Sequence, residues 1–131
     1  MKPDWVESHI NQIKKYQLIL NDVPEECRPE RIETLSKMLV YIGRLAAELS
    51  EEYKRVYATR KRVYAEAYID APNSKAARAE LAVTELRQEE SVAYGNMKRW
   101  SNAFESTKEE INALKYKVKI DIEDGSSRRG A

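Results

Sequence analysis

The residues with the clearest chemical potential lie between positions 53 and 68, where basic side chains alternate with tyrosines. The segment from Tyr53 to Tyr64 reads YKRVYATRKRVY, and Tyr68 follows four residues later. Basic side chains neutralise phosphates, and tyrosine rings offer flat faces on which unpaired bases stack. The pattern is therefore typical of a surface that binds single-stranded nucleic acid. The predicted site consists of Lys54, Arg55, Tyr57, Arg60, Lys61, Arg62, Tyr64, Tyr68, Lys75 and Arg78.

Positive charge is concentrated in the same part of the chain. Residues 53–78 carry 7 Lys and Arg against 2 Asp and Glu, which gives +5, whereas the whole chain of 131 residues has a net charge of +1. A local basic stretch attracts polyanions even when the molecule is nearly neutral. The alternative is a solvated helix face whose tyrosines lean on a neighbouring helix. The segment by itself does not separate DNA from RNA.

Other chemistry has little support in the sequence. His9 and Cys27 are the single His and Cys, so the chain lacks the set for a structural zinc site, an internal disulfide or a nucleophilic triad. The four pairs of adjacent glutamates lack the Glu-x-x-His spacing of a helical di-metal site. A glycine-rich phosphate-binding loop is also missing. We expect a non-enzymatic protein with no catalytic residue, metal or cofactor.

The composition favours an all-α fold. The chain has 4 Gly and 4 Pro, too few turn formers for a many-stranded sheet, and its 42% hydrophobic and 34% charged residues suit one globular domain. The predicted helices are Trp5–Asp22, Pro29–Ile69 and Lys75–Glu123. We expect one helical domain over residues 1–123 and a flexible tail at 124–131.

Two of these helices carry heptad patterns, which predict coiled-coil-like packing. The link Asp70–Ser74 is short, so the helices should form a long antiparallel hairpin. Arg60 stands at a position where an apolar residue is expected. The first pattern is Ile32, Leu35, Leu39, Ile42, Ala46, Leu49, Tyr53, Val56, Arg60, Val63 and Ala67. The second is Leu86, Glu90, Ala93, Met97, Trp100, Phe104, Thr107, Ile111, Leu114 and Val118.

Smaller features add detail to this hairpin. The β-branched pair Val83-Thr84 predicts a break near the start of the third helix. A cap is expected at Asn73 or Ser74. Gly43 and Gly95, inside helical patterns, predict close packing between helices. The N-terminal helix, with the face Trp5, Ile10, Ile13, Leu18 and Leu20, should pack on a wider apolar arc formed by Met38, Val40, Tyr41 and Leu45.

An elongated hairpin has a poor surface-to-volume ratio, which favours association of several copies. Aromatic and aliphatic residues of the third helix could serve either the core or such an interface. The candidates for oligomerisation are Trp100, Phe104, Ile111, Leu114 and Val118.

The order of these features resembles the UvsY-type recombination mediators of T-even phages, over roughly residues 50–120. The segment 59–64, TRKRVY, is similar to that family's Lys-x-Arg segment for single-stranded DNA. Trp100 and the segment 111–115, INALK, are similar to the C-terminal helix that assembles the family's ring-like oligomers. The family's longer glycine- and acid-rich loop is absent here, because the link at 70–74 is shorter, and the N-terminal third has no counterpart.

The resemblance implies DNA contacts for Arg60 and Arg62, and packing or assembly for Trp100, Ile111 and Leu114. It also implies a function without a chemical step. A homo-oligomer would bind single-stranded DNA through several basic surfaces and help a RecA-like recombinase load where single-strand-binding protein already sits.

Two other classes of function remain open. The heptads fit a coiled-coil structural or adaptor protein that binds another protein equally well, and a small regulator or inhibitor is a third possibility. The lone cysteine and the lack of a signal peptide predict a cytoplasmic protein, and the lack of an apolar span predicts no association with a membrane. If the chain is phage-encoded, the cytoplasm would be that of the bacterial host.

Overall fold

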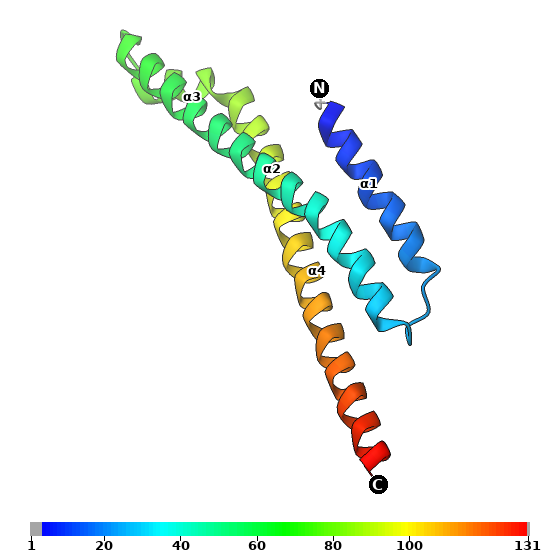
Figure 1. The fold of residues 1–131 in the computed structure, drawn as a ribbon. Helices are drawn as coiled ribbons and strands as arrows, with labels where there is room; N and C mark the ends of the chain where they lie inside the picture. Colours follow the sequence, from blue (N-terminus) through cyan, green and yellow to red (C-terminus); the bar gives the residue numbers. More distant parts are fainter. Residues whose placement is uncertain (1–3, 131) are drawn as a thin grey trace. The chain divides into compact units, whose positions relative to one another are not determined.

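The computed structural model describes residues 4–130, with side chains as far as residue 125. The described chain forms α1 (Asp4–Asn21), α2 (Arg28–Asp70), α3 (Lys75–Ala82) and α4 (Thr84–Gly130), shown in chain order in Figure 1. No strand occurs within this range. The predicted all-α fold, a helical hairpin with an additional N-terminal helix, is therefore confirmed.

The link between α1 and α2 ends where the sequence signals predict. Pro29 occupies the first turn of α2, where its missing N–H costs no hydrogen bond. Arg31 fastens the link, because its Nη1 donates to the carbonyl oxygens of Leu20 at 3.3 Å and Val23 at 2.8 Å. One guanidinium of α2 thus binds both the last turn of α1 and the link that follows it.

The link between α2 and α3 is held by a lysine. Lys75 Nζ donates to the carbonyl oxygens of Tyr68 at 3.3 Å, Ile69 at 3.4 Å and Ala71 at 2.6 Å. Ser74 occupies the N-cap of α3 with φ 45° and ψ 45°, but its side chain makes no capping hydrogen bond. The predicted cap residue is therefore in place, while the polar groups of this turn are satisfied mainly by Lys75.

Val83 separates α3 from α4, so the predicted break at Val83-Thr84 is confirmed. Its φ of −108° and ψ of 10° leave the helical range, and its N–H turns back to the carbonyl oxygen of Glu80 at 3.3 Å. The Val83 side chain is fully buried. A buried apolar residue at the break fixes where α4 begins.

The chain divides into two compact units. Unit 1 contains the described residues up to Leu45 and those from Ser101 on, and unit 2 contains Ala46–Trp100. Each unit includes a part of α2 and a part of α4. The single helical domain predicted over residues 1–123 stays a prediction.

In unit 1, α1 packs on the first part of α2. The Tyr16 and Tyr41 rings stack with their centres 6.1 Å apart, and the His9 and Tyr41 rings meet edge to face at 5.6 Å. Met38 and Leu45 are buried, which confirms most of the predicted arc. The prediction is wrong for two residues. Val40, placed in this arc, and Leu18, placed in the facing stripe of α1, are both exposed and stand on exposed faces of their helices.

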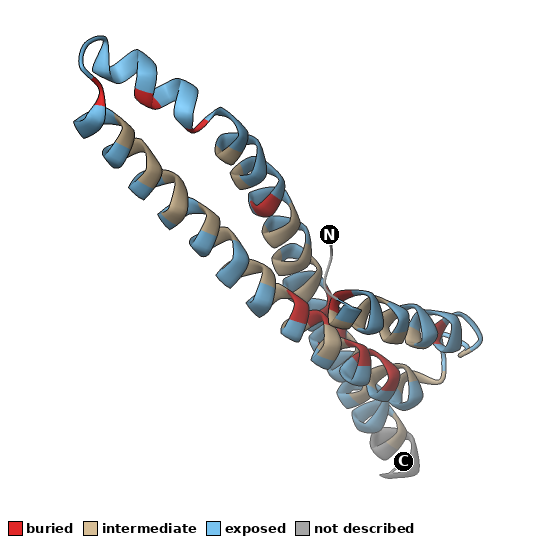
Figure 2. Cartoon of the chain, turned by 90° about the horizontal axis from the view of Figure 1, so that it is seen from above, coloured by how far each residue is buried: buried red, intermediate tan, exposed pale blue. Residues whose placement is uncertain are grey.

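The heptad patterns are confirmed residue by residue. Every position of both patterns is buried or half-buried, and Figure 2 shows the buried residues on the inner sides of the helices. The innermost residues of unit 1 include Leu35 and Leu45, whereas those of unit 2 are small: Ala71, Ala79, Val83 and Ala93. The described residues therefore form a continuous α2–α4 seam within each unit.

α4 continues past the predicted helix end. Its helical backbone reaches Gly130, seven residues beyond Glu123. The side chains of 126–130 and the whole of residue 131 lie outside the described part, and the flexibility of the tail at 124–131 stays a prediction.

The two helical glycines have different surroundings. A Cβ at Gly43 would lie 3.1 Å from Phe104 Cε2, so the prediction of close packing is confirmed there. A Cβ at Gly95 would meet nothing within 4 Å, so the same prediction is wrong for Gly95, which stands on an open helix face.

Gly95→Ala should stabilise the protein by about 1 kcal/mol, because alanine restricts the unfolded chain and nothing opposes it in the fold. Gly43→Ala should gain clearly less, because the Phe104 ring must move to admit the new methyl group. Urea unfolding of both variants, followed by circular dichroism, compares the two free energies of unfolding. Equal stabilisation by both substitutions would contradict the close contact at Gly43.

Candidate nucleic-acid interface

Five of the ten predicted residues follow one side of α2, next to the seam. Tyr57, Lys61, Tyr64 and Tyr68 are spaced by three and four residues, and Lys54 precedes Lys61 by two helical turns. Tyr57 is 36% exposed and Tyr68 44%, Tyr64 is half-buried, and both lysines are exposed. These five residues, all in unit 2, are called the tyrosine–lysine stripe below.

The stripe combines aromatic faces with cations. Lys61 Nζ lies 4.8 Å from the centre of the Tyr57 ring, and the Tyr64 and Tyr68 rings stack with centres 6.3 Å apart and planes inclined by 25°. Within the described residues, Lys54 and Lys61 form no ion pair. Both ammonium groups can therefore bind an external anion without first losing an internal partner.

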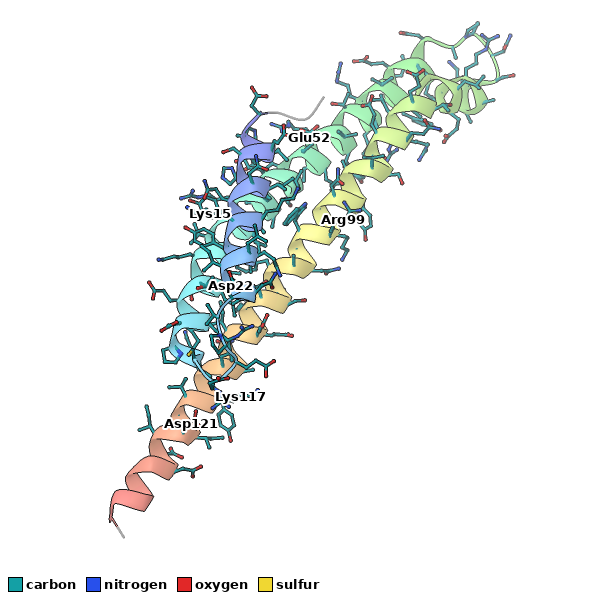
Figure 3. The ribbon with its side chains drawn as sticks, turned by 90° about the vertical axis from the view of Figure 1, so that its right-hand side faces the viewer. Lys15, Asp22, Glu52, Arg99, Lys117 and Asp121 are labelled. Carbon is teal, nitrogen blue, oxygen red and sulfur yellow. The ribbon has the colours of Figure 1, made fainter. Side chains whose placement is uncertain are left out.

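Arg55 and Arg62 lie farther round α2, away from the seam. Arg55 Nη2 is 2.6 Å from Glu52 Oε2, and Arg62 Nη1 is 3.5 Å from Glu66 Oε1. Glu52, labelled in Figure 3, has a side chain that is 49% exposed. Such exposed pairs contribute little to stability, but each carboxylate offsets an arginine charge. The structure thus separates these two arginines from the stripe with which the sequence groups them.

Arg60 occupies a different environment, inside the seam. It forms an ion pair with Glu90 of α4 through Nε, and its Nη2 lies 3.4 Å from Glu90 Oε1. The side chains of the pair are only 14% and 16% exposed. The hydrogen bond to Glu90 raises the pKa of the Arg60 guanidinium against the opposing effect of burial. Two charged residues at heptad positions are therefore compensated by each other.

Arg60 also contacts the tyrosine–lysine stripe from the seam side. Its guanidinium carbon lies 5.3 Å from the centre of the Tyr57 ring. The geometry makes Arg60 a positioning residue for Tyr57, whereas the sequence pattern places it both at a heptad position and among the DNA-binding cations.

Lys75 and Arg78, at the start of α3, lie beyond the Tyr68 end of the stripe. Lys75 caps α2 as described above, and its Nζ stands 5.9 Å from the Tyr68 ring centre. Arg78 Nη2 donates to Asn73 Oδ1 at 3.2 Å. Both side chains are exposed, but each already takes part in holding the turn.

Sequence reasoning missed Arg87 and two acidic residues. Arg87 of α4 forms two hydrogen bonds to the Glu80 carboxylate, at 3.0 and 2.9 Å. Arg87 and Glu80 line a hollow of about 400 Å³ together with Arg60, Lys61 and Tyr64. The charge sum over residues 53–78 excludes Glu80 and Glu90, although the fold brings both beside the basic segment.

Two of the five residues predicted for oligomerisation pack within unit 1, and assembly through the other three stays a prediction. Ile111 is buried in unit 1, and Phe104 lies against Gly43. Trp100, Leu114 and Val118 are half-buried. Burial of Ile111 inside one chain leaves it no surface for a second copy, so its observed role is in the core. The exposed apolar side chains of α4 in unit 1 are Tyr116, Ile120 and Ile122.

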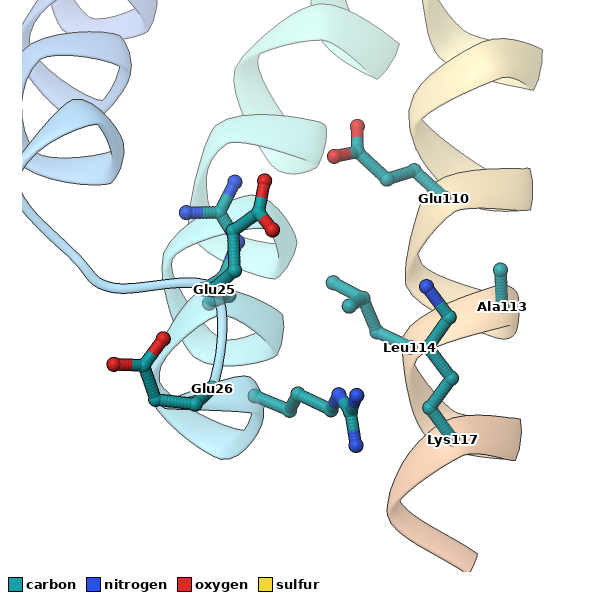
Figure 4. A pocket seen from close by; sticks show the side chains of 8 residues that line it. Glu25, Glu26, Glu110, Ala113, Leu114 and Lys117 are labelled. Carbon is teal, nitrogen blue, oxygen red and sulfur yellow. The ribbon is translucent and has the colours of Figure 1, made fainter. Parts of the chain in front are cut away.

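Unit 1 contains a second hollow, of about 430 Å³, between the α1–α2 link, α2 and α4 (Figure 4). Glu25 and Glu26 of the link and Glu110 of α4 line it together with Arg28, Arg31 and Lys117. The mixture of charges gives this hollow no preference for a polyanion. Across the described residues, no group of three acidic, His or Cys side chains is placed to hold a metal ion.

The comparisons with family models, curated proteins and solved structures find no match for this chain. Among the described helices, none is long and apolar enough to cross a membrane. The functional argument therefore depends on the geometry of the interface itself.

Removing either partner of the Arg60–Glu90 pair should destabilise the fold. We expect Arg60→Ala and Glu90→Ala each to lower the free energy of unfolding by about 1.5–3 kcal/mol, because each leaves a charge without its hydrogen-bonded partner. The double variant Arg60→Met with Glu90→Leu should regain most of this loss by apolar packing. Urea unfolding measures all three. Independent, additive losses in the double variant would show that the two side chains are not coupled.

Proposed function

We propose that this protein is a non-catalytic, single-stranded DNA-binding accessory protein of recombination, which helps a RecA-like recombinase load where single-strand-binding protein is present. The observation that carries the DNA-binding part is the tyrosine–lysine stripe, in which two lysines without an ion pair in the described structure alternate with three tyrosine rings on one side of α2. The recombinase and the single-strand-binding protein are proposed from the resemblance to UvsY-type mediators.

The dimensions of the stripe suit a short piece of a single strand. At 1.5 Å rise per residue, Lys54 and Tyr68 are separated by about 21 Å along α2. A strand with about 3.4 Å between stacked bases would place some six nucleotides along this length. The lysines would bind phosphates and the rings would stack on bases, which gives affinity with little sequence preference.

One stripe with two available lysines binds weakly by itself. Several copies in a homo-oligomer would raise the effective affinity, because later stripes bind a strand that is already held. Leu114 and Val118 lead by steps of four to Ile122, which is 63% exposed. The heptad alternation itself continues at Asp121, so Ile122 lies beside the seam, and its exposure supports association through the C-terminal part of the helix.

The alternative is a coiled-coil structural or adaptor protein. The exposed apolar side chains Tyr116, Ile120 and Ile122 favour it, since they would equally suit a helix of another protein. The two functions differ in what the stripe does. An adaptor has no need of DNA affinity.

The DNA-binding proposal is tested with fluorescently labelled oligothymidylate and anisotropy over a range of salt concentrations. Wild-type affinity should fall as salt rises, because bound phosphates release counterions. The plot of log affinity against log salt concentration has a negative slope. The double variant Lys54→Ala with Lys61→Ala should lower the magnitude of this slope by about 1.4, because each lost phosphate contact on a single strand lowers it by about 0.7. Lys14→Ala with Lys15→Ala, two exposed lysines of α1, is the control of equal charge and should behave as wild type.

A wild-type protein that leaves the anisotropy unchanged at low salt would overturn the proposal in favour of the adaptor function. Equal losses in the two lysine pairs would also overturn it, because binding would then follow net charge and not the stripe.

Assembly is tested by light scattering. We expect a mass above that of one 15.2 kDa chain, and Ile122→Glu should shift the population toward the monomer by placing a charge in the apolar contact. Val92→Glu, an exposed apolar position of unit 2, is the control and should leave the mass unchanged. A wild-type protein that is monomeric at all concentrations would remove multivalent binding from the proposal.

A further inference from the structure

A chain of tyrosine rings crosses the seam from α2 to α4 within unit 2. The Tyr53 ring lies 6.3 Å from that of Tyr57 on the same helix and 5.4 Å from that of Tyr94 on α4. Tyr53 is half-buried, so it joins the two outer rings and itself offers little surface. The aromatic surface that begins in the tyrosine–lysine stripe therefore continues onto α4.

Tyr94 repeats the ring-and-cation arrangement of the stripe. Its side chain is 44% exposed, and Lys98 Nζ lies 5.9 Å from the ring centre. Lys98 is exposed and forms no ion pair within the described part of the chain. The pair thus offers a flat ring face and an available ammonium group, as Tyr57 and Lys61 do.

The register of the hairpin puts both arrangements on one side. Tyr57, Tyr64 and Tyr68 lie at offsets of −3, +4 and +8 from Arg60, and Arg87, Tyr94 and Lys98 lie at the same offsets from its partner Glu90. Two antiparallel helices are related by a local two-fold axis, and here the axis passes close to the Arg60–Glu90 pair. Residues at equal offsets therefore emerge on the same side of the hairpin.

Two contacts support this placement independently. The Tyr53–Tyr94 ring contact joins the helices on one side of the Arg60–Glu90 pair, and the hollow shared by Lys61, Tyr64 and Arg87 joins them on the other. Glu80 and Glu90, which contact Arg87 and Arg60 on this side, are each engaged with an arginine. An approaching polyanion therefore meets these two carboxylates already compensated.

We propose that Tyr94 and Lys98 form a second subsite for single-stranded DNA, in which a base stacks on the Tyr94 ring and the adjoining phosphate binds Lys98. The strand then crosses from α2 to α4 and does not follow α2 alone. This inference rests on the proposed DNA-binding function, but its residues lie outside the stripe that carries that function.

The test compares tyrosine variants of the full chain on a labelled oligothymidylate of about twelve nucleotides, long enough to reach both helices. Tyr94→Ala should weaken binding by about fivefold or more, the loss typical of one base–aromatic stack. Tyr94→Phe keeps the ring and should bind as wild type. Tyr116→Ala removes a tyrosine of unit 1 that is more exposed than Tyr94, 65% against 44%, and is the control.

A strand of the same length built from abasic sugars separates stacking from structure. It carries the phosphates without the bases, so wild type and Tyr94→Ala should bind it equally. The same loss on both strands would show that Tyr94 only supports the fold and would overturn the inference. Lys98→Ala should lower the magnitude of the salt slope by about 0.7, whereas the exposed-site control Lys108→Ala should not change it.

The outcomes keep the two proposals apart. Wild-type binding together with unchanged affinity in Tyr94→Ala would overturn the second subsite and leave the function of the stripe intact. Failure of the wild-type protein to bind any strand would overturn both. Circular dichroism of each variant, compared with wild type, shows that the helices are retained.

Discussion

Burial of α2 against α4 along the heptad seam is the constraint on which the other features depend. In unit 2 the seam combines half-buried apolar side chains with one largely buried ion pair, Arg60–Glu90. A slip of either helix would leave Arg60 and Glu90 without each other while both remain largely out of water, which is costly. We infer that this pair fixes the register. Tyr53 then lies beside Tyr94, and the outer rings and cations of both helices emerge together.

The same pairing changes how the charge of the chain should be counted. Summed along the sequence, the basic segment has a large positive excess, but three of its four arginines are engaged with acidic residues of α2 or α4: Arg55 with Glu52, Arg60 with Glu90, and Arg62 with Glu66. The cations of the stripe and of the Tyr94 side that have no ion pair in the described structure are lysines: Lys54, Lys61 and Lys98. Lysine is a compact point charge that suits phosphates in many geometries, whereas paired arginines here rigidify the scaffold.

Much of the fold could be predicted from sequence because its signals are local. Prolines mark the links, the steps of three and four mark the buried positions of α2 and α4, and Val83-Thr84 marks the break. The site was less accessible. The stripe on α2 follows from helical periodicity, but the partner of Arg60, the contact between Tyr53 and Tyr94 and the open space at Gly95 depend on the register between helices, which no single segment contains. The residues expected to join copies of the chain illustrate the same point, since a heptad pattern does not say whether its partner helix lies in the same chain.

The capping of α2 by Lys75 has an electrostatic consequence for the surface beside it. The peptide dipoles of a long helix place a partial negative charge at its C-terminal end. For α2 this pole lies immediately beyond Tyr68, where it would repel a phosphate chain approaching the outermost ring. The Lys75 ammonium group, which donates hydrogen bonds to the carbonyl oxygens of Tyr68, Ile69 and Ala71, places a full positive charge at that pole. A side chain that closes the turn thereby also offsets the negative end of the helix dipole beside the last ring of the stripe, at an end of α2 where Asp70 adds a carboxylate.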